Sequence, residues 1–454
     1  MTASVFEQFL STPEIGAVFS DAAIIQGMLD FEAALARAQA EEGVIPAHAA
    51  ALIAPACRVE RYELAPIVAA SSVAGTLAIP LIRQLMAEVA KRDAEAAGCV
   101  HWGSTSQDVI DTAMVLATKR ALTLIDARLR DLIAALCALA QRDGGAPMLG
   151  RTLLQPALVI SFGFKLVSWA APLVRCRERL RVAAQDALKL QLGGAAGTLS
   201  AMGDKGPAVA RRMAAQLELG LAPGNWHTQR DEWVALGCEV GVLCGVLGKI
   251  AKDISLLAQA EVGEVAEPGG GGRGGSSAMP HKRNPVASMI ALAASMRAPH
   301  RVAALLAAMP LEHERGLGNW QAELAEWPGL FMSAHGAVHA LADAAAGLSV
   351  DTARMRRNVD ALHGLVFAEA VAMLLAMHIG KPRAHALLEA WSRQAVAERM
   401  HLLNVVLAAV AVDAELRDKV APEALRSVFD VDAVARRASA LARPQWDTIN
   451  KATS

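Results

Sequence analysis

A glycine-rich segment between two apolar stretches carries the side chains best suited to chemistry. Six of the seven residues from 269 to 275 are glycine, and Ser276, Ser277, Lys282 and Asn284 follow. Connections in helical bundles normally need about 2–8 residues, so a longer loop that ends in hydroxyl, ammonium and amide groups indicates a mobile lid over a small-molecule site. The segment lacks both the GK[ST] ending of a phosphate-binding loop and a GxSxG elbow. A plain flexible linker stays open as the alternative.

A second polar cluster precedes a long apolar stretch. His101, Thr105, Ser106 and Asp108 lie in the segment HWGSTSQDVIDT, residues 101–112. Hydroxyl and carboxylate side chains at this position are typical of a helix N-cap. The same hydroxyls can bind a carboxylate, because the free backbone N–H groups of a helix N-terminus attract anions. The residues alone leave both interpretations open, and a lone histidine such as His101 is more often structural.

The segment GSSAMPHKRN, residues 275–284, resembles the G-S-S-x-M-P-x-K-x-N signature of the fumarase/aspartase superfamily at every specified position. The resemblance implies that Ser276 is the acid–base residue and that Ser277, Lys282 and Asn284 bind a carboxylate substrate. A structural hydroxyl stays open for Ser277. A serine ionised by backbone dipoles could exchange a proton with the carbon beside a carboxylate, while loop N–H groups hold the resulting aci-carboxylate.

The segment around residue 101 is similar to a second region of the same superfamily. This similarity implies that Thr105 and Ser106 bind substrate, and that His101 does so as in the adenylosuccinate lyase branch. Two weaker similarities add Gln229, in a Q-R-D segment, and Arg315, which could clamp an additional carboxylate. A helix cap for Gln229 and a surface charge pair for Arg315 stay open.

The stretch GRTLLQPA, residues 150–157, resembles the family's G-R-T-H-x-Q stretch with one departure. Thr152 and Gln155 match and are implied to bind substrate, but Leu153 stands where the C–N lyases have a histidine for proton transfer. A nitrogen leaving group is poor without a proton, whereas a carboxylate leaves unaided because its conjugate acid has a pKa near ~4. Leu153 therefore favours a reaction whose leaving group is a carboxylate.

One branch of the superfamily has such a leaving group. It cyclises 3-carboxy-cis,cis-muconate to 4-carboxymuconolactone during the degradation of aromatic compounds through protocatechuate, and residues 193–200 also resemble it. We therefore expect an intramolecular lyase, an isomerase in outcome, that needs no cofactor and no metal. His335 and His339, four residues apart, have no third ligand nearby and are interpreted as structural. The alternatives are an adenylosuccinate-type C–N lyase and a non-catalytic structural protein, as in the lens crystallins related to argininosuccinate lyase.

Composition excludes several other classes. The 454 residues are 54% hydrophobic and 20% charged with a formal net charge of -1, which excludes a disordered chain and gives no basic excess for nucleic acid. No apolar run reaches the ~20 residues of a membrane span, and the N-terminus lacks the charged start of a signal peptide. The six cysteines form no CxxC pair, which favours free thiols in the cytoplasm. We expect a cytoplasmic enzyme whose partner is a small polycarboxylate, without nucleic acid or membrane.

The elements that must position these residues are helices. Ala and Leu dominate and aromatic residues are 4%, so we expect an all-α fold, a long central bundle flanked by two small helical domains. The domains expected are 1–107, 108–350 with the mobile loop 267–285, and 351–454. Patterns predict long helices over residues 108–142, 156–191, 231–257, 286–309 and 329–347. The 231–257 helix is apolar on more faces than one chain would cover, which predicts a homotetramer. The resemblance to the superfamily implies that its active sites are shared between subunits.

Overall fold

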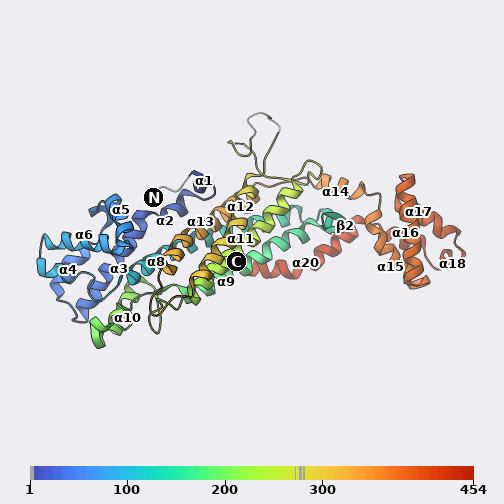
Figure 1. Ribbon diagram of the computed structural model, residues 1–454. Coiled ribbons are helices and arrows are strands. Elements are labelled where there is room, and N and C mark those ends of the chain that lie inside the picture. The colour runs from blue at the N-terminus through green and yellow to red at the C-terminus, as the bar shows by residue number, and fades with distance from the viewer. Residues whose placement is uncertain (1–4, 271, 276–278, 280–281, 454) are drawn as a thin grey trace. The chain divides into compact units, whose positions relative to one another are not determined.

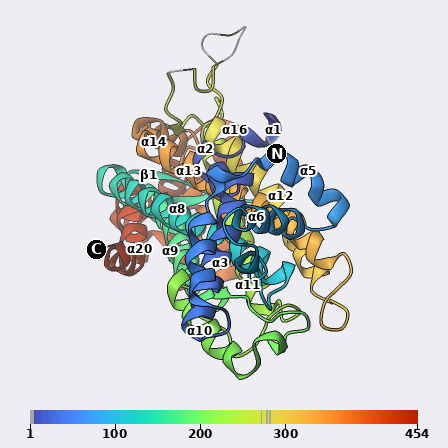
Figure 2. The same ribbon diagram turned by 90° about the vertical axis from the view of Figure 1, so that its left-hand side faces the viewer.

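The computed structural model describes residues 5–270, 272–275, 279 and 282–453, and its ribbon is shown in Figures 1 and 2. The chain divides into two compact units. Unit 1 comprises Met1–Arg130, Arg175–Gly248 and Met289–Leu341, and unit 2 comprises Asp131–Val174, Lys249–Ser288 and Ala342–Ser454. The expected three-domain division, with boundaries at 107 and 350, stays a prediction.

The five long helices that the hydrophobic patterns predicted all have a counterpart among the described residues. They are α8 (Ser106–Asp143), α9 (Phe162–Ala187), α11 (Asp231–Leu257), α12 (Val286–Ala308) and α13 (Asn319–Ala346). The predicted α8 and α12 are confirmed to within two residues, and α11 has the predicted bounds. The predicted start at residue 329 is wrong, because α13 begins at Asn319 and contains Pro328 in its interior.

The predicted helix over 156–191 is wrong at both ends, because α9 begins at Phe162 and stops at Ala187, before strand β3 (Lys189–Leu190). Residues Gln155–Ser161 form strand β2, which pairs in an antiparallel hairpin with β1 (Pro147–Thr152). A run such as ALVIS, rich in β-branched residues, suits a strand as well as a buried helix start. The other described strands are two residues long: β3 lies parallel to β4 (Gly220–Leu221), and β5 (Val265–Ala266) lies antiparallel to β6 (Ser349–Val350). The fold class is all-α, as expected.

Shorter helices complete unit 1. Figure 1 shows α3, α4 and α6 packed together, and Figure 2 shows α10 beside α3. These helices are α1 (Val5–Gln8), α2 (Pro13–Val18), α3 (Asp21–Glu41), α4 (Ala47–Ala56), η1 (Val59–Arg61), α5 (Leu64–Ala74), α6 (Ala78–Ala90), α7 (Ala94–Ala97), η2 (Ser200–Lys205) and α10 (Gly206–Leu217).

The C-terminal part of unit 2 is also helical. Its helices pack around a core that includes Val371, Leu402, Val406 and Leu425, all buried. They are α14 (Thr352–Asp360), η3 (Leu365–Phe367), α15 (Ala368–Ile379), α16 (Lys381–Glu398), α17 (Leu402–Val412), α18 (Ala414–Arg417), α19 (Pro422–Val428) and α20 (Val431–Thr453). In Figure 1, α15, α16, α17 and α18 form a group coloured from orange to orange-red.

Helix α11 is the most apolar long helix. By length and composition it could cross a membrane, and among the described residues no other single helix passes that test. The core helix of a soluble protein passes the same test. Its apolar residues at alternating spacings of three and four are all buried, as the pattern predicted: Trp233, Leu236, Val240, Leu243, Leu247, Ile250, Ile254 and Leu257. This burial is what we expect of a helix that packs inside a bundle.

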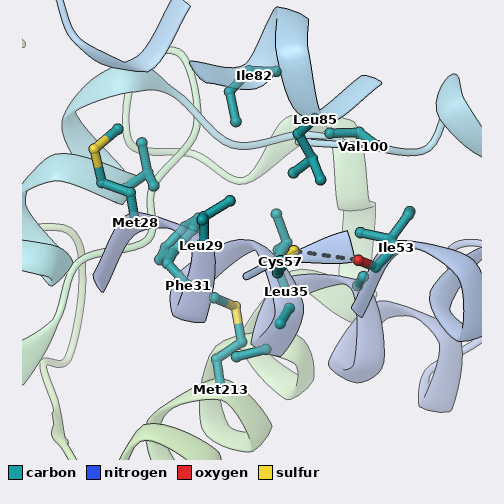
Figure 3. Packing of buried hydrophobic residues seen from close by; sticks show 14 of the residues in the cluster. Met28, Leu29, Phe31, Leu35, Ile53, Cys57, Ile82, Leu85, Val100 and Met213 are labelled. Atoms are coloured by element: carbon teal, nitrogen blue, oxygen red, sulfur yellow. Dashed lines mark hydrogen bonds between the residues drawn. The ribbon is translucent and has the colours of Figure 1, made fainter. Parts of the chain in front are cut away.

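The core of unit 1 holds helix α3 in place. Figure 3 shows Met28, Leu29, Phe31 and Leu35 of α3 packed among labelled side chains from α4, α6 and α10. The Cys57 thiol donates to the carbonyl of Ile53 at 3.3 Å, so this buried thiol has a hydrogen-bond partner. Close packing of this kind resists small displacements. The one acidic side chain buried on the same helix, Glu32, is therefore held on a rigid element.

Candidate active site

A cavity of about 310 Å³ in unit 1 brings together three of the predicted site residues. His101, Thr105 and Ser106 line it with Ser104, and helix α6 supplies the rest of the lining, including Arg83. Arg83 is exposed and forms no hydrogen bond or ion pair with any residue that the structure describes. The lining therefore offers the guanidinium of Arg83, the imidazole of His101 and three hydroxyl groups. Such a cavity suits an anionic, carboxylate-bearing ligand.

The loop before α8 has an unusual backbone. His101 has a φ of 59° and Gly103 a φ of 71°, both in the left-handed region. A Cβ on Gly103 would lie 3.2 Å from side-chain atoms of Ala201 and Met202, so only glycine fits there without displacement. This tight turn places the His101 side chain in the cavity lining just before the helix begins.

His101 is bound to a buried carboxylate. Its Nδ1 lies 2.6 Å from Oε1 of Glu32 and 2.9 Å from Oγ of Ser104. Burial alone would lower the pKa of His101, but the charge of Glu32, the hydrogen bond to it and the charge of Asp108 outweigh burial and raise that pKa above its ordinary value. The protonated form of His101 is therefore favoured more strongly than in a free histidine.

Asp108 ties the start of α8 to a neighbouring loop. Its buried carboxylate accepts hydrogen bonds from the N–H groups of Thr105 (3.0 Å), Gly193 (2.9 Å) and Gly194 (2.9 Å), and from Nε2 of His227 at 2.7 Å. The bond to Thr105 is that of a capping box, so the N-cap interpretation of this cluster is confirmed for Asp108. The same bonds fix Thr105 at the cavity.

Arg315 joins this network. Its Nη2 donates to Oγ1 of Thr105 at 2.5 Å and to the carbonyl oxygens of Gly194 (3.1 Å) and Ala195 (3.0 Å). Its Nε is buried without a hydrogen-bond partner among the described residues. Arg315 thus lies next to a cavity residue, with its buried Nε–H unused.

Gln229 is placed differently from its neighbour Arg230. Gln229 is exposed and its amide donates to the carbonyl of Asn225 at 3.2 Å, which agrees with a local structural role. Arg230 is buried between the carboxylates of Asp111 and Glu323, and each of its three nitrogens donates to one or both of them inside unit 1. Gln229 does not line the described cavity.

The remaining described candidates lie in unit 2. Thr152 and Gln155 are the paired residues that end the β1–β2 hairpin, and both are exposed. Leu153 and Leu154 form the two-residue turn between them, with φ values of 51° and 65°, and their side chains are 96% and 73% exposed. A turn with two positive φ values is a type I′ hairpin turn, which normally prefers Asn-Gly.

The glycine-rich loop is anchored at its base. The N–H of Asn284 donates to the carbonyl of Gly274 at 2.9 Å, and the Glu267 carboxylate accepts from the N–H groups of Ala287 and Ser288 at the start of α12. Lys282 and Asn284 are exposed. Ser276 and Ser277 lie outside the described residues.

Sequence reasoning missed Glu32, Arg83 and His227. Glu32 had a detectable signal, because it falls on the same helical face as Met28 and Leu35, where a charge interrupts an apolar stripe. Its pairing with His101 spans 69 positions, and no local pattern predicts such a contact. Among the described residues, no group of three or more His, Cys, Asp or Glu is arranged to hold a metal ion.

The family profile described as lyase matches residues 9–299. A curated 3-carboxy-cis,cis-muconate cycloisomerase of Bradyrhizobium diazoefficiens is 48% identical, over 93% of this chain and 92% of the relative. The enzyme of the same name from Pseudomonas aeruginosa is 48% identical, over 91% and 90%. The crystal structure of the 3-carboxy-cis,cis-muconate lactonizing enzyme from Pseudomonas putida matches with a TM-score of 0.91 and 41% identity, covering 100% of both chains. The chain belongs to this lyase family, within the fumarase/aspartase superfamily.

Proposed function

We propose that this chain is an intramolecular lyase that converts 3-carboxy-cis,cis-muconate to 4-carboxymuconolactone in the degradation of aromatic compounds. The observation that carries the proposal is the near full-length likeness to curated cycloisomerases, 48% identity over 93% of the chain. The site chemistry agrees with it. Leu153 places no proton donor at the tip of the hairpin. A carboxylate that attacks or leaves needs no proton there, because its conjugate acid has a low pKa.

The proposed reaction begins with a carboxylate of the substrate attacking a carbon of the C=C bond. The new C–O bond closes the lactone ring, and the π electrons move to the carbon beside a second carboxylate, forming an aci-carboxylate. Neutral Ser276 then returns a proton to that carbon. In the reverse direction ionised Ser276 removes this proton and the carboxylate leaves. Backbone N–H groups of the loop stabilise the developing charge.

The binding roles follow the sequence motifs. Thr105 and Ser106 hold one substrate carboxylate at the N-terminus of α8, with His101 beside them in the same cavity. Lys282 and Asn284 hold another from the loop, with Ser277. Thr152 and Gln155 contribute from the hairpin, and Arg315 and Gln229 are the remaining proposed contacts. Of these last two, Arg315 has the stronger support, because it bonds directly to Thr105.

The proposed assembly is a homotetramer in which three subunits supply the three motif regions of each site. Support comes from an apolar groove of about 750 Å³ along α9, α11 and α12 of unit 1. Val182, Val242 and Leu306 on these helices are 44–49% exposed in the single chain. Large apolar groups left exposed in this way are typical of surfaces that bind another subunit. The six free cysteines agree with the cytoplasmic location that we propose.

A direct assay tests the function. The purified protein is given 3-carboxy-cis,cis-muconate, and loss of diene absorbance is followed together with lactone formation by proton NMR. We expect turnover of this substrate and none of adenylosuccinate. Fumarate release from adenylosuccinate would instead support the C–N lyase alternative, and no turnover of either substrate would support a structural protein.

A further inference from the structure

A buried carboxylate lies behind the cavity and has no role in the reaction outlined above. Glu32 of α3 is 1% exposed, and its Oε2 has no hydrogen-bond partner among the described residues. An isolated buried charge is strongly unfavourable, so a carboxylate at such a site needs a cation beside it. The cation available is His101, whose Nδ1 lies 2.6 Å from Oε1 of Glu32.

This pairing decides which nitrogen of His101 can meet a ligand. Nδ1 is occupied by Glu32, with Oγ of Ser104 at 2.9 Å. The side chain lines the cavity and is 18% exposed. Nε2 is therefore the ring nitrogen left for a molecule in the cavity. With Nδ1–H bound to Glu32, a second proton on Nε2 would make it a charged donor.

We propose that Glu32 is a positioning residue that holds His101 as a cation, with Nε2–H donated to a carboxylate of the substrate in the cavity. The inference rests on the proposed function for the identity of that substrate. His101 would add charge-assisted binding to the hydroxyls of Thr105 and Ser106. Glu32 itself would touch neither substrate nor reacting atoms.

Three charged groups face His101 from the surrounding elements. Glu32 approaches from α3 and Asp108 from the first turn of α8, while Arg83 of α6 lines the same cavity. Asp108 already accepts three backbone hydrogen bonds and one from His227, so its charge is largely compensated. The unpartnered oxygen is on Glu32, which makes Glu32 the stronger anion toward His101.

The packing of α3 makes this arrangement rigid. Phe31 and Leu35, on either side of Glu32 along the helix, are fully or almost fully buried in the core shown in Figure 3. Because α3 is held by this packing, the Glu32 carboxylate stays in place. It therefore fixes the orientation of the His101 ring before any ligand binds. Preorganised donors of this kind bind a charged group more tightly than mobile ones.

The main test is the titration of His101 and the pH dependence of substrate binding. Glu32→Gln keeps an acceptor for Nδ1–H but removes the charge, and Glu41→Gln removes a charge from the exposed end of the same helix as the matched control. Histidine labelled with ¹³C is titrated by NMR, and the His101 signal is assigned by its absence in His101→Gln. We expect the His101 pKa to fall in Glu32→Gln and to stay unchanged in Glu41→Gln.

Kinetics give the second readout. In Glu32→Gln we expect KM for 3-carboxymuconate to rise more above the ordinary pKa of histidine than below it, with kcat changed far less, because a neutral imidazole loses the charge-assisted bond to the substrate. His101→Gln should abolish this pH dependence, and adding Glu32→Gln to it should cost nothing further.

Three results would overturn the inference. The first is a wild-type His101 that titrates at or below its ordinary pKa. The second is an unchanged pH profile of KM in Glu32→Gln, and the third is additive losses in the double variant. The wild-type titration needs no turnover, and the one variant it uses is His101→Gln, for the assignment of the signal. If the wild type does not act on 3-carboxymuconate, the proposed function fails, while the NMR still decides whether Glu32 holds His101 as a cation.

Discussion

At the residue level, Ser276 is the side chain on which the proposed chemistry depends most. Replacing it with alanine should lower kcat for 3-carboxymuconate by ~10² or more, because a general acid–base group is lost while the binding residues remain. KM and the thermal transition should change little. Steady-state kinetics and circular dichroism of Ser276→Ala measure both.

The neighbouring serine provides the matched control for this prediction. Ser277→Ala should retain most of the turnover, and Lys282→Ala should mainly raise KM because it removes a cation from the exposed end of the loop. If Ser276→Ala turned over like the wild type while Ser277→Ala did not, the acid–base role would belong to Ser277.

Leu153 tests the argument about the leaving group. If a carboxylate leaves without a proton, a general acid at this position is unnecessary, and Leu153→His should give no gain in kcat for 3-carboxymuconate. A loss is expected where the imidazole is buried against the diene without a partner. The measurement is kcat for this substrate in wild type and variant, with adenylosuccinate as the control substrate. Efficient cleavage of adenylosuccinate by the wild type would contradict the leaving-group argument.

The individual residues show where sequence reasoning succeeds and where it stops. His101, Thr105 and Ser106 could be named from one short segment, and the structure places all three on one cavity. Glu32 and Arg83 reach the same region from other helices, at positions that only the packing of α3 and α6 determines. A motif records neighbours along the chain, whereas the charge balance of a site depends on neighbours in space.

Among the elements, helices were easier to predict than the hairpin. The bounds of helix α11 could be predicted because eight apolar residues recur along it at alternating spacings of three and four, and all eight are buried. The β1–β2 hairpin was missed because Leu153 and Leu154 form its turn in a conformation that leucine rarely adopts. Nothing in the local residue types indicates a turn there. The Asn or Gly that would have signalled one is absent.

This hairpin leads to a prediction about stability and activity together. The double substitution Leu153→Asn with Leu154→Gly should stabilise the fold by about 1 kcal/mol, because these residues accept positive φ without the strain that leucine has. Turnover should fall if the exposed leucines shape the substrate pocket. Chemical denaturation and kcat, measured on the same preparation, check the two effects.

Leu158→Asn is the matched control for the hairpin. Leu158 is 46% exposed on β2 but lies outside the turn, so its replacement removes apolar surface without relieving any strained φ. It should not raise stability. Equal gains from both changes would mean that loss of exposed apolar surface, rather than turn geometry, explains the stabilisation.

At the scale of the whole molecule, His335 should make stability depend on pH. It is fully buried in α13, its Nδ1 lies 3.1 Å from Oγ1 of Thr12, and its Nε2 has no partner among the described residues. Burial, with the charges of His339 and Arg128, lowers the pKa of His335 to about 4. The unfolded chain binds this proton near its ordinary pKa of about 6.5, so stability falls as pH drops from about 6.5 to 4.

The size of the effect can be isolated with His335→Asn, whose amide replaces Nδ1 as the partner of Thr12. The wild type should lose about 3 kcal/mol relative to this variant between pH 7 and pH 4, because a shift of 2.5 pKa units is worth that much. Denaturant unfolding at fixed protein concentration measures the difference. Parallel stability curves for the two proteins would show that His335 does not titrate as a buried neutral group.

The proposed tetramer makes the strongest prediction about the molecule as a whole. If the three motif regions of one site come from three subunits, two inactive variants can complement each other. The variants are Thr105→Ala with Ser106→Ala, which disables the α8 region, and Ser276→Ala, which disables the loop. Each homotetramer carries the same defect in every site and should be inactive.

Mixing the two variants after dissociation distributes the defects among subunits. Some reassembled sites then combine an intact α8 region from one subunit with an intact loop from another, so activity should reappear in the mixture. Analytical ultracentrifugation must show that the mixture has returned to tetramers, and two preparations of the same variant mixed in the same way serve as the control. Activity that stays at the level of the separate variants in fully reassembled tetramers would mean that each chain builds its site alone. The exposed apolar surface of α9, α11 and α12 would then serve assembly without serving catalysis.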